Sequence, residues 1–105
     1  MTEQDWQDAL SECRTRIDAV DLRILALLNE RTAIVERIGQ IKQQAQLPIY
    51  EPKREDEVFR NVLGHNGGPL PADCVKRVFE RIIDEMRVVQ RVRMEQQRAR
   101  EGKQG

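Results

Sequence analysis

The first 46 residues carry an uninterrupted apolar repeat, which constrains the fold more than any other feature of the chain. Gly39 is the only residue in the repeat that is unfavourable in a helix interior, and the repeat contains no proline. Thr2, with Asp5 three positions later, can cap the start of a helix. We predict one helix over about residues 5–46. Its apolar residues follow a three-four spacing: Leu10, Cys13, Ile17, Val20, Ile24, Leu27, Ile34, Ile38, Ile41 and Ala45.

A helix of this length needs more cover than the rest of the chain provides. At 1.5 Å per residue it is roughly 60 Å long. A compact domain of about 100 residues has a radius of gyration of only about 13 Å. We therefore expect a second chain to pack along the helix through a coiled-coil type of seam.

Two breaks divide the chain into three segments. Proline and glycine are frequent in residues 47–52 and 64–71, so both stretches are expected to be turns. A second helix is predicted to start at Pro52, and a third to run from near Pro71 to about residue 96. The predicted fold class is all-α with three helices per chain. We expect one domain over residues 1–97 and a frayed, polar C-terminal tail over residues 98–105.

Composition limits the partners and the compartment. The chain has 18 basic and 18 acidic residues, and this balance argues against nucleic acid as a partner. The sequence contains no run of about 18 apolar residues that could cross a membrane. Residues 1–5 are polar and acidic, without the apolar region typical of a signal peptide. Cys13 and Cys74 are too few for a disulfide framework or a metal site. We expect a cytoplasmic protein without a metal.

The end of the third helix is locally basic. A solvated helix end with cations near its C-terminus explains this better than an arm that binds RNA. The residues concerned are Arg87, Arg91, Arg93, Arg98, Arg100 and Lys103.

Two cations occupy one stripe of the first helix. Arg31 stands where the repeat calls for an apolar residue, and Lys42 follows about three turns later, within roughly 20° of the same direction. Arg31 could set the register of a coiled coil or extend to the edge of the seam. The pair instead indicates a pocket for an anion. Arg14 points about 100° away, so it would more easily serve the pocket of a partner chain.

The other helices also carry polar residues on apolar faces. Glu55 continues the face of Val58 and Val62, with Arg54 beside it and Glu51 one turn earlier. Taken alone, these acids are typical of exposed first-turn residues that favour the helix dipole.

In the third helix, Gln90 extends the apolar stripe four residues after Met86. The alternative for Gln90 is a helix end that simply becomes polar. The sequence contains no nucleophile–base pair, metal cluster or phosphate-binding glycine loop, and His65 and the Gly67-Gly68 pair fall in a turn. Any chemistry is therefore expected to rely on charge and shape rather than on proton transfer.

The order and spacing of these residues resemble the all-helical AroQ class of chorismate mutases. The resemblance covers residues 10–91 and rests on five motifs. They are Arg14-x-x-Ile17-Asp18-x-x-Asp21-x-x-Ile24-Leu25-x-Leu27-Leu28-x-x-Arg31, Ile38-Gly39-x-x-Lys42, Pro48-Ile49-Tyr50-x-Pro52-x-Arg54-Glu55, Gly68-Pro69-Leu70, and Phe79-x-x-Ile82-Ile83 followed by Gln90.

The resemblance implies an intertwined homodimer that rearranges chorismate to prephenate in phenylalanine and tyrosine biosynthesis, without a cofactor or covalent intermediate. It implies that Arg14 of one chain, with Arg31 and Arg54 of the other, grips the two substrate carboxylates. Lys42 and Gln90 would then donate hydrogen bonds to the ether oxygen.

The resemblance also implies that Glu55, together with Glu51, accepts a hydrogen bond from the ring hydroxyl. Met86 stands where the best-known members have a serine donor, so the ring carboxylate is expected to lose a contact. Two other functions stay open at this point. One is an isochorismate pyruvate lyase on the same fold, and the other is a non-catalytic helical dimerisation module in which Arg31 sets the register.

Overall fold

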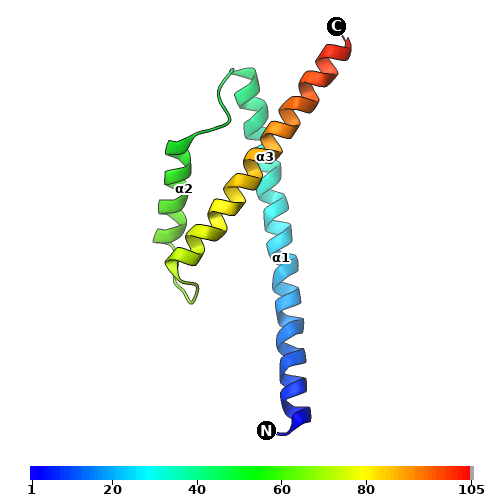
Figure 1. Cartoon of the computed structure of the whole chain (residues 1–105), viewed down its shortest axis with the longest axis vertical. Helices are drawn as coiled ribbons and strands as arrows, with labels where there is room; N and C mark the ends of the chain where they lie inside the picture. The colour runs from blue at the N-terminus through cyan, green and yellow to red at the C-terminus, as the bar shows by residue number, and fades with distance from the viewer. Residues whose placement is uncertain (105) are drawn as a thin grey trace. The chain divides into compact units, whose positions relative to one another are not determined.

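The computed structural model describes residues 1–104, and the side chains of residues 1–102. It contains three α-helices, α1 (Glu3–Gln44), α2 (Pro52–Gly64) and α3 (Ala72–Gln104), and no strand within residues 1–104 (Figure 1). The expected all-α class with three helices per chain is confirmed. None of the described helices combines the length and apolarity needed to cross a membrane.

The chain divides into two units, Met1–Ala33 and the residues from Ile34 onward, and α1 contributes to both. At the start of α1, Asp5 N donates to Thr2 Oγ1 at 3.1 Å and Thr2 N donates to Asp5 Oδ2 at 3.0 Å. This reciprocal pair is a capping box, as predicted. The hydrogen bond from the Thr2 backbone, followed by the contact with its side chain, lowers the pKa of Asp5.

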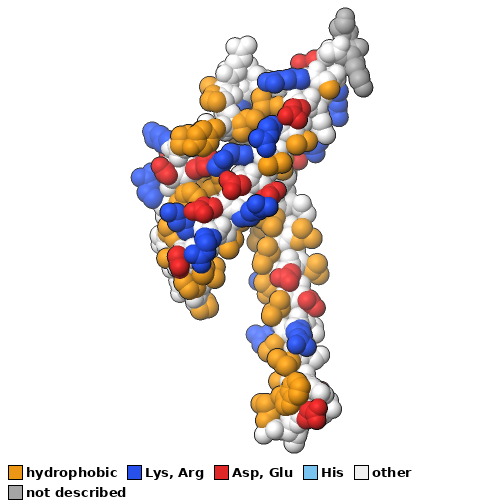
Figure 2. Space-filling view, in the orientation of Figure 1, with side chains coloured by type: hydrophobic (Ala, Val, Ile, Leu, Met, Phe, Trp, Pro, Cys, Tyr) orange, Lys and Arg blue, Asp and Glu red, His pale blue; other side chains and the backbone are white. Residues whose placement is uncertain are grey.

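The unit Met1–Ala33 exposes its apolar side chains. Ile17 is 59% exposed and Leu27 is 63% exposed, and hydrophobic side chains run along this part of the chain in Figure 2. No residue between Met1 and Ala33 is buried. A long apolar stripe of this kind normally marks an interaction surface. Its cover by a second chain stays a prediction.

A left-handed residue ends α1 and turns the chain toward α2. Gln46 has φ 57°, its N–H donates to Gln43 O at 3.3 Å, and the next N–H, of Leu47, donates to Lys42 O at 2.7 Å. This pair of bonds is a Schellman motif, in which glycine is the usual left-handed residue. It ends the helix at Gln44, two residues before the predicted end.

The unit that begins at Ile34 has a small core. Its buried apolar side chains are Val35 from α1 and Val75 and Ile83 from α3. The helix α2 runs antiparallel to α3 and packs against it (Figure 1). Because this core is small, polar contacts also contribute to the packing of the helices against one another.

The face of α1 that this unit buries differs from the predicted seam. Val35, Gly39 and Lys42 are buried. Ile38 and Ile41, which belong to the predicted repeat, are 40% and 46% exposed. The C-terminal part of α1 therefore has one face that is buried within the unit and a second, apolar face that is exposed to solvent.

The predicted end of α3 at about residue 96 is wrong, because the helix continues to Gln104. No proline interrupts this stretch, and Gln97 Nε2 donates to Glu101 Oε1 one turn later at 3.2 Å. Residues 98–104 are thus helical rather than frayed. Gly105 and the side chains of Lys103 and Gln104 lie outside the described residues.

Candidate active site

Lys42 is a buried ammonium group held by the segment that follows α1. It is 7% exposed. Its Nζ donates to Ile49 O at 2.9 Å and lies 2.7 Å from Glu51 Oε1. The turn at Gln46 makes these contacts possible, because it brings the following residues back along the last turn of α1. An ammonium has three donors, so these two contacts leave one N–H by count for a ligand.

Glu51 precedes α2 but does not cap it. It occupies the N-cap position, and its side chain makes no capping hydrogen bond. Pro52 follows at the first helical position, where the missing N–H removes one donor that would need a cap. The carboxylate of Glu51 pairs with Lys42 instead, so the start of α2 serves the site rather than the helix end.

Gln90 is an amide buried against α1. It is 7% exposed, and its Nε2 donates to Val35 O over a long 3.4 Å. A Cβ added to Gly39 would lie 3.5 Å from Gln90 Cγ, so the glycine lets α3 approach α1 closely here. Lys42 follows Gly39 on the same buried face of α1. The prediction that Gln90 is more than the polar end of a helix is supported by its burial.

A second ion pair joins α2 to α3. Arg87 lies 2.7 Å from Glu55 Oε1, and the Glu55 side chain is 19% exposed. The Arg87 guanidinium carbon also lies 5.3 Å from the centre of the Tyr50 ring, in cation–π geometry. Glu55 is therefore not a solvated first-turn acid, and each of the two acids, Glu51 and Glu55, faces a cation from another helix.

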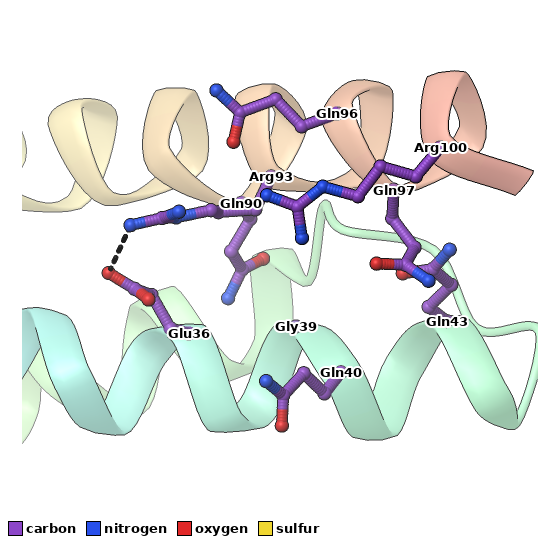
Figure 3. Close-up of a pocket in the computed structure, with 9 residues that line it drawn as sticks. All are labelled: Glu36, Gly39, Gln40, Gln43, Gln90, Arg93, Gln96, Gln97 and Arg100. Carbon is purple, nitrogen blue, oxygen red and sulfur yellow. Dashed lines mark hydrogen bonds and ion pairs between the residues drawn. The ribbon is translucent and has the colours of Figure 1, made fainter. Parts of the chain in front are cut away.

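A hollow of about 150 Å³ lies beside Gln90, between the last part of α1 and α3. Gln90 points from α3 toward α1 in Figure 3, and Arg93 reaches Glu36 at 3.4 Å. Of the residues predicted for the site, Gln90 alone lines this hollow. Amides and arginines make up most of the remaining lining: Glu36, Gly39, Gln40, Gln43, Arg93, Gln96, Gln97 and Arg100.

The predicted residues that remain are Arg54, Met86, Arg14 and Arg31. Arg54 is exposed and pairs with Glu57 at 3.2 Å on its own helix. Met86 is half-buried on α3. Arg14 and Arg31 belong to the unit Met1–Ala33, and their part in a site stays a prediction.

Sequence reasoning missed Arg87 and Tyr50. The sequence places Arg87 in the basic end of α3, yet its guanidinium group contacts α2 and the segment before it. The sequence signal for Arg87 is its position on the inner face of α3, because it is four residues after the buried Ile83 and adjoins Met86. Its partners come from another helix, which local periodicity does not reveal.

Lys42, Arg87 and Gln90 supply cationic and amide donors. Glu51 and Glu55 supply carboxylate acceptors. Buried donors of this kind stabilise negative charge that develops on a bound molecule, because the low-dielectric surroundings strengthen each interaction. Within the described residues, no group of three or more His, Cys, Asp or Glu side chains is arranged to hold a metal ion. The arrangement suits a small polar anion whose reaction proceeds by charge stabilisation.

Fold and site together define a three-helix protein with a buried lysine and a buried glutamine. Residues 13–91 match the family described as chorismate mutase type II. The chain belongs to the chorismate mutase type II family.

Two relatives share parts of this region. The bifunctional chorismate mutase/prephenate dehydratase of Aquifex aeolicus is 42% identical over 80 residues, which are 72% of this chain and 22% of that protein. This chain therefore spans only about a fifth of that relative. The chorismate mutase of Methanocaldococcus jannaschii is 34% identical over 55 residues, covering 52% of this chain and 56% of that protein.

Solved structures of similar size share the fold. The Helicobacter pylori chorismate mutase in complex with prephenate has a TM-score of 0.79 and 28% identity, over 84% of this chain and 96% of that one. Form II of the Thermus thermophilus chorismate mutase has a TM-score of 0.77 and 31% identity, over 79% of this chain and 94% of that one.

Proposed function

We propose that this chain is a chorismate mutase, an isomerase that rearranges chorismate to prephenate in the synthesis of phenylalanine and tyrosine. The family supports this activity, as does the similar Helicobacter pylori enzyme, which was solved with prephenate. The observation that carries the proposal is the buried Lys42 ammonium, held by two contacts and retaining one donor by count.

The rearrangement breaks a C–O bond and forms a C–C bond within one molecule. Negative charge grows on the ether oxygen as the C–O bond breaks, so a fixed donor at that oxygen lowers the barrier. Lys42 is the cationic donor for this role. Gln90 is the neutral donor, because its amide has two N–H groups and the long contact with Val35 O uses one of them.

The substrate carries two carboxylates, and arginines suit them because guanidinium groups can pair bidentately. In the proposal, Arg31 and Arg54 of one chain and Arg14 of the partner grip these groups and hold the reactive conformer. Glu55, with Glu51, accepts from the ring hydroxyl. Arg54 must leave its surface pair with Glu57 to take part. Met86 offers no hydroxyl, so the ring carboxylate has one donor fewer.

The proposed assembly is a homodimer with shared sites. The apolar stripe of α1 is exposed along both units, while only three apolar side chains are buried in the described part of the chain. A second copy would cover this stripe, and crossed helices would bring Arg14 into the partner's site. Sedimentation at micromolar concentration should give a dimer, whereas a folded monomer would contradict this assembly.

The proposal also covers the domain bounds, the cellular compartment and the partners. The mutase domain is assigned to residues 1–97, and residues 98–105 extend beyond the part that the family matches. The expected compartment is the cytoplasm, and neither nucleic acid nor a membrane is expected as a partner.

The test is loss of chorismate absorbance on adding purified protein, with the product identified chromatographically. Prephenate is the expected product. Release of pyruvate from isochorismate in a parallel reaction would favour the lyase. No turnover of either compound would favour a dimerisation module.

A further inference from the structure

Arg87 is fixed from three directions. Its Nη2 lies 2.7 Å from Glu55 Oε1 and 3.3 Å from Asp84 Oδ1, one turn earlier on α3. The ring of Tyr50 lies against the guanidinium group, with its centre 5.3 Å from the guanidinium carbon. These contacts come from α3, from α2 and from the segment before α2, so the plane of the guanidinium group has little freedom.

The Arg87 side chain also carries a cost that packing alone does not explain. Its Nε is buried and has no hydrogen-bond partner, and an unsatisfied buried donor is unfavourable. An apolar side chain of similar length would cover Tyr50 without this cost. What such a side chain would lose is the charge opposite Glu55.

Glu55 needs that charge if a dianion binds nearby. Its side chain is mostly shielded from water, and a shielded carboxylate without a cation is costly and repels other anions. Lys42 offsets Glu51 in the same way. Each of the two acids therefore has a cation opposite it, which reduces the repulsion that a dicarboxylate substrate would meet.

We propose that Arg87 is a positioning residue, which orients Glu55 toward the substrate and offsets part of its charge. One oxygen of the Glu55 carboxylate binds Arg87, and the remaining acceptor capacity meets the ring hydroxyl. This inference rests on the proposed mutase function. It assigns Arg87 no contact with the reacting atoms.

The predicted effect is on substrate binding. In Arg87→Met, Glu55 is misdirected and its charge is uncompensated, so KM for chorismate should rise on the order of tenfold while kcat changes less. Glu55→Gln removes the charge that Arg87 offsets. The double variant Arg87→Met/Glu55→Gln should therefore have a KM no higher than that of Glu55→Gln alone.

The matched control is Arg81→Met. Arg81 also lies on α3 and also pairs with a glutamate, Glu85, at 2.9 Å, but its side chain is 78% exposed. Its removal should leave KM at the parental value. A KM for Arg87→Met equal to that of Arg81→Met, in an active parent, would overturn the inference, and so would a double variant whose KM exceeds that of Glu55→Gln alone.

A second variant and the activity of the parent protein complete the test. If Arg87→Met does not fold, Arg87→Lys decides instead. Lysine keeps the charge but not the planar fork, so a KM about threefold or more above the parent supports the inference and a parental KM overturns it. A parent protein that does not turn over chorismate would refute the proposed function itself, which is a different outcome.

Discussion

Lys42 at the end of α1 and Glu51 before α2 form an ion pair of 2.7 Å in which the lysine is buried and the glutamate is half-exposed. The glutamate holds the ammonium in place while the N-terminus of α2 is left without a side-chain cap. The Glu51 side chain thus fixes the buried cation and leaves the helix end uncapped.

Replacing Lys42 by Ala should lower turnover far more than it lowers stability. In the proposed chemistry this donor acts on charge that develops in the transition state, and loss of one such donor typically reduces kcat about 10²- to 10³-fold. The control is Lys76→Ala on the exposed side of α3, which should keep parental kinetics. A Lys42→Ala protein with kcat within a few-fold of the parent would remove Lys42 from the proposed chemistry.

Replacing Gln90 by Glu should confine activity to low pH. Only the protonated acid can donate to the ether oxygen, and burial favours the neutral acid by raising its pKa. Activity should therefore be present at acidic pH and be lost as the pH rises, while the parent shows no such loss over that range. The measurement is the pH profile of kcat for both proteins, and identical profiles would argue against a role for the Gln90 amide.

Gly39 should tolerate Ala but not a branched residue. An Ala Cβ would meet Gln90 Cγ at an ordinary 3.5 Å contact, and Ala in a helix interior is favoured over Gly by up to about 1 kcal/mol. Gly39→Ala should therefore be as stable as the parent or more so in urea unfolding, with similar kcat. Gly39→Val should displace Gln90 and lower kcat. Equal kcat for the two variants would show that the close approach does not position Gln90.

Gln46 adopts a conformation that glycine adopts more readily, with φ 57°. The left-handed region costs residues other than glycine roughly 1–2 kcal/mol, so glycine would remove this cost. The greater freedom of glycine in the unfolded chain offsets part of the resulting stabilisation. Gln46→Gly should raise the free energy of unfolding by up to about 1 kcal/mol. Gln44→Gly, inside α1 without positive φ, should not stabilise. Stabilisation by the second variant and not the first would contradict the assigned turn.

Local signals in the sequence were sufficient for the helices and for most of their ends. The Thr2–Asp5 pair and Pro52 predicted two helix starts, because caps and prolines act on their immediate neighbours. The end of α1 was placed two residues late, because Gln46 is not a residue type that signals a left-handed turn. The helix α3 continues beyond its predicted end, because a polar composition alone does not end a helix.

The site could be predicted only in part, for a related reason. Lys42 and Gln90 interrupt apolar stripes, so periodicity indicated that they are unusual, and both are buried. Their partners Ile49 and Val35 are backbone carbonyls, which carry no sequence signal. Arg87 escaped notice because its partner, Glu55, lies 32 residues away, and charge alone does not say which arginine faces another helix.

The most direct test of a shared mutase site mixes two inactive proteins. Arg14→Ala and Lys42→Ala should each be nearly inactive as homodimers. After the two are unfolded together and refolded, random assortment makes half the dimers mixed, and in each mixed dimer one site has both Lys42 and the partner's Arg14. About a quarter of the parental chorismate turnover should return. If the mixture stays as inactive as its components while the refolded parent recovers, Arg14 does not cross to the partner's site.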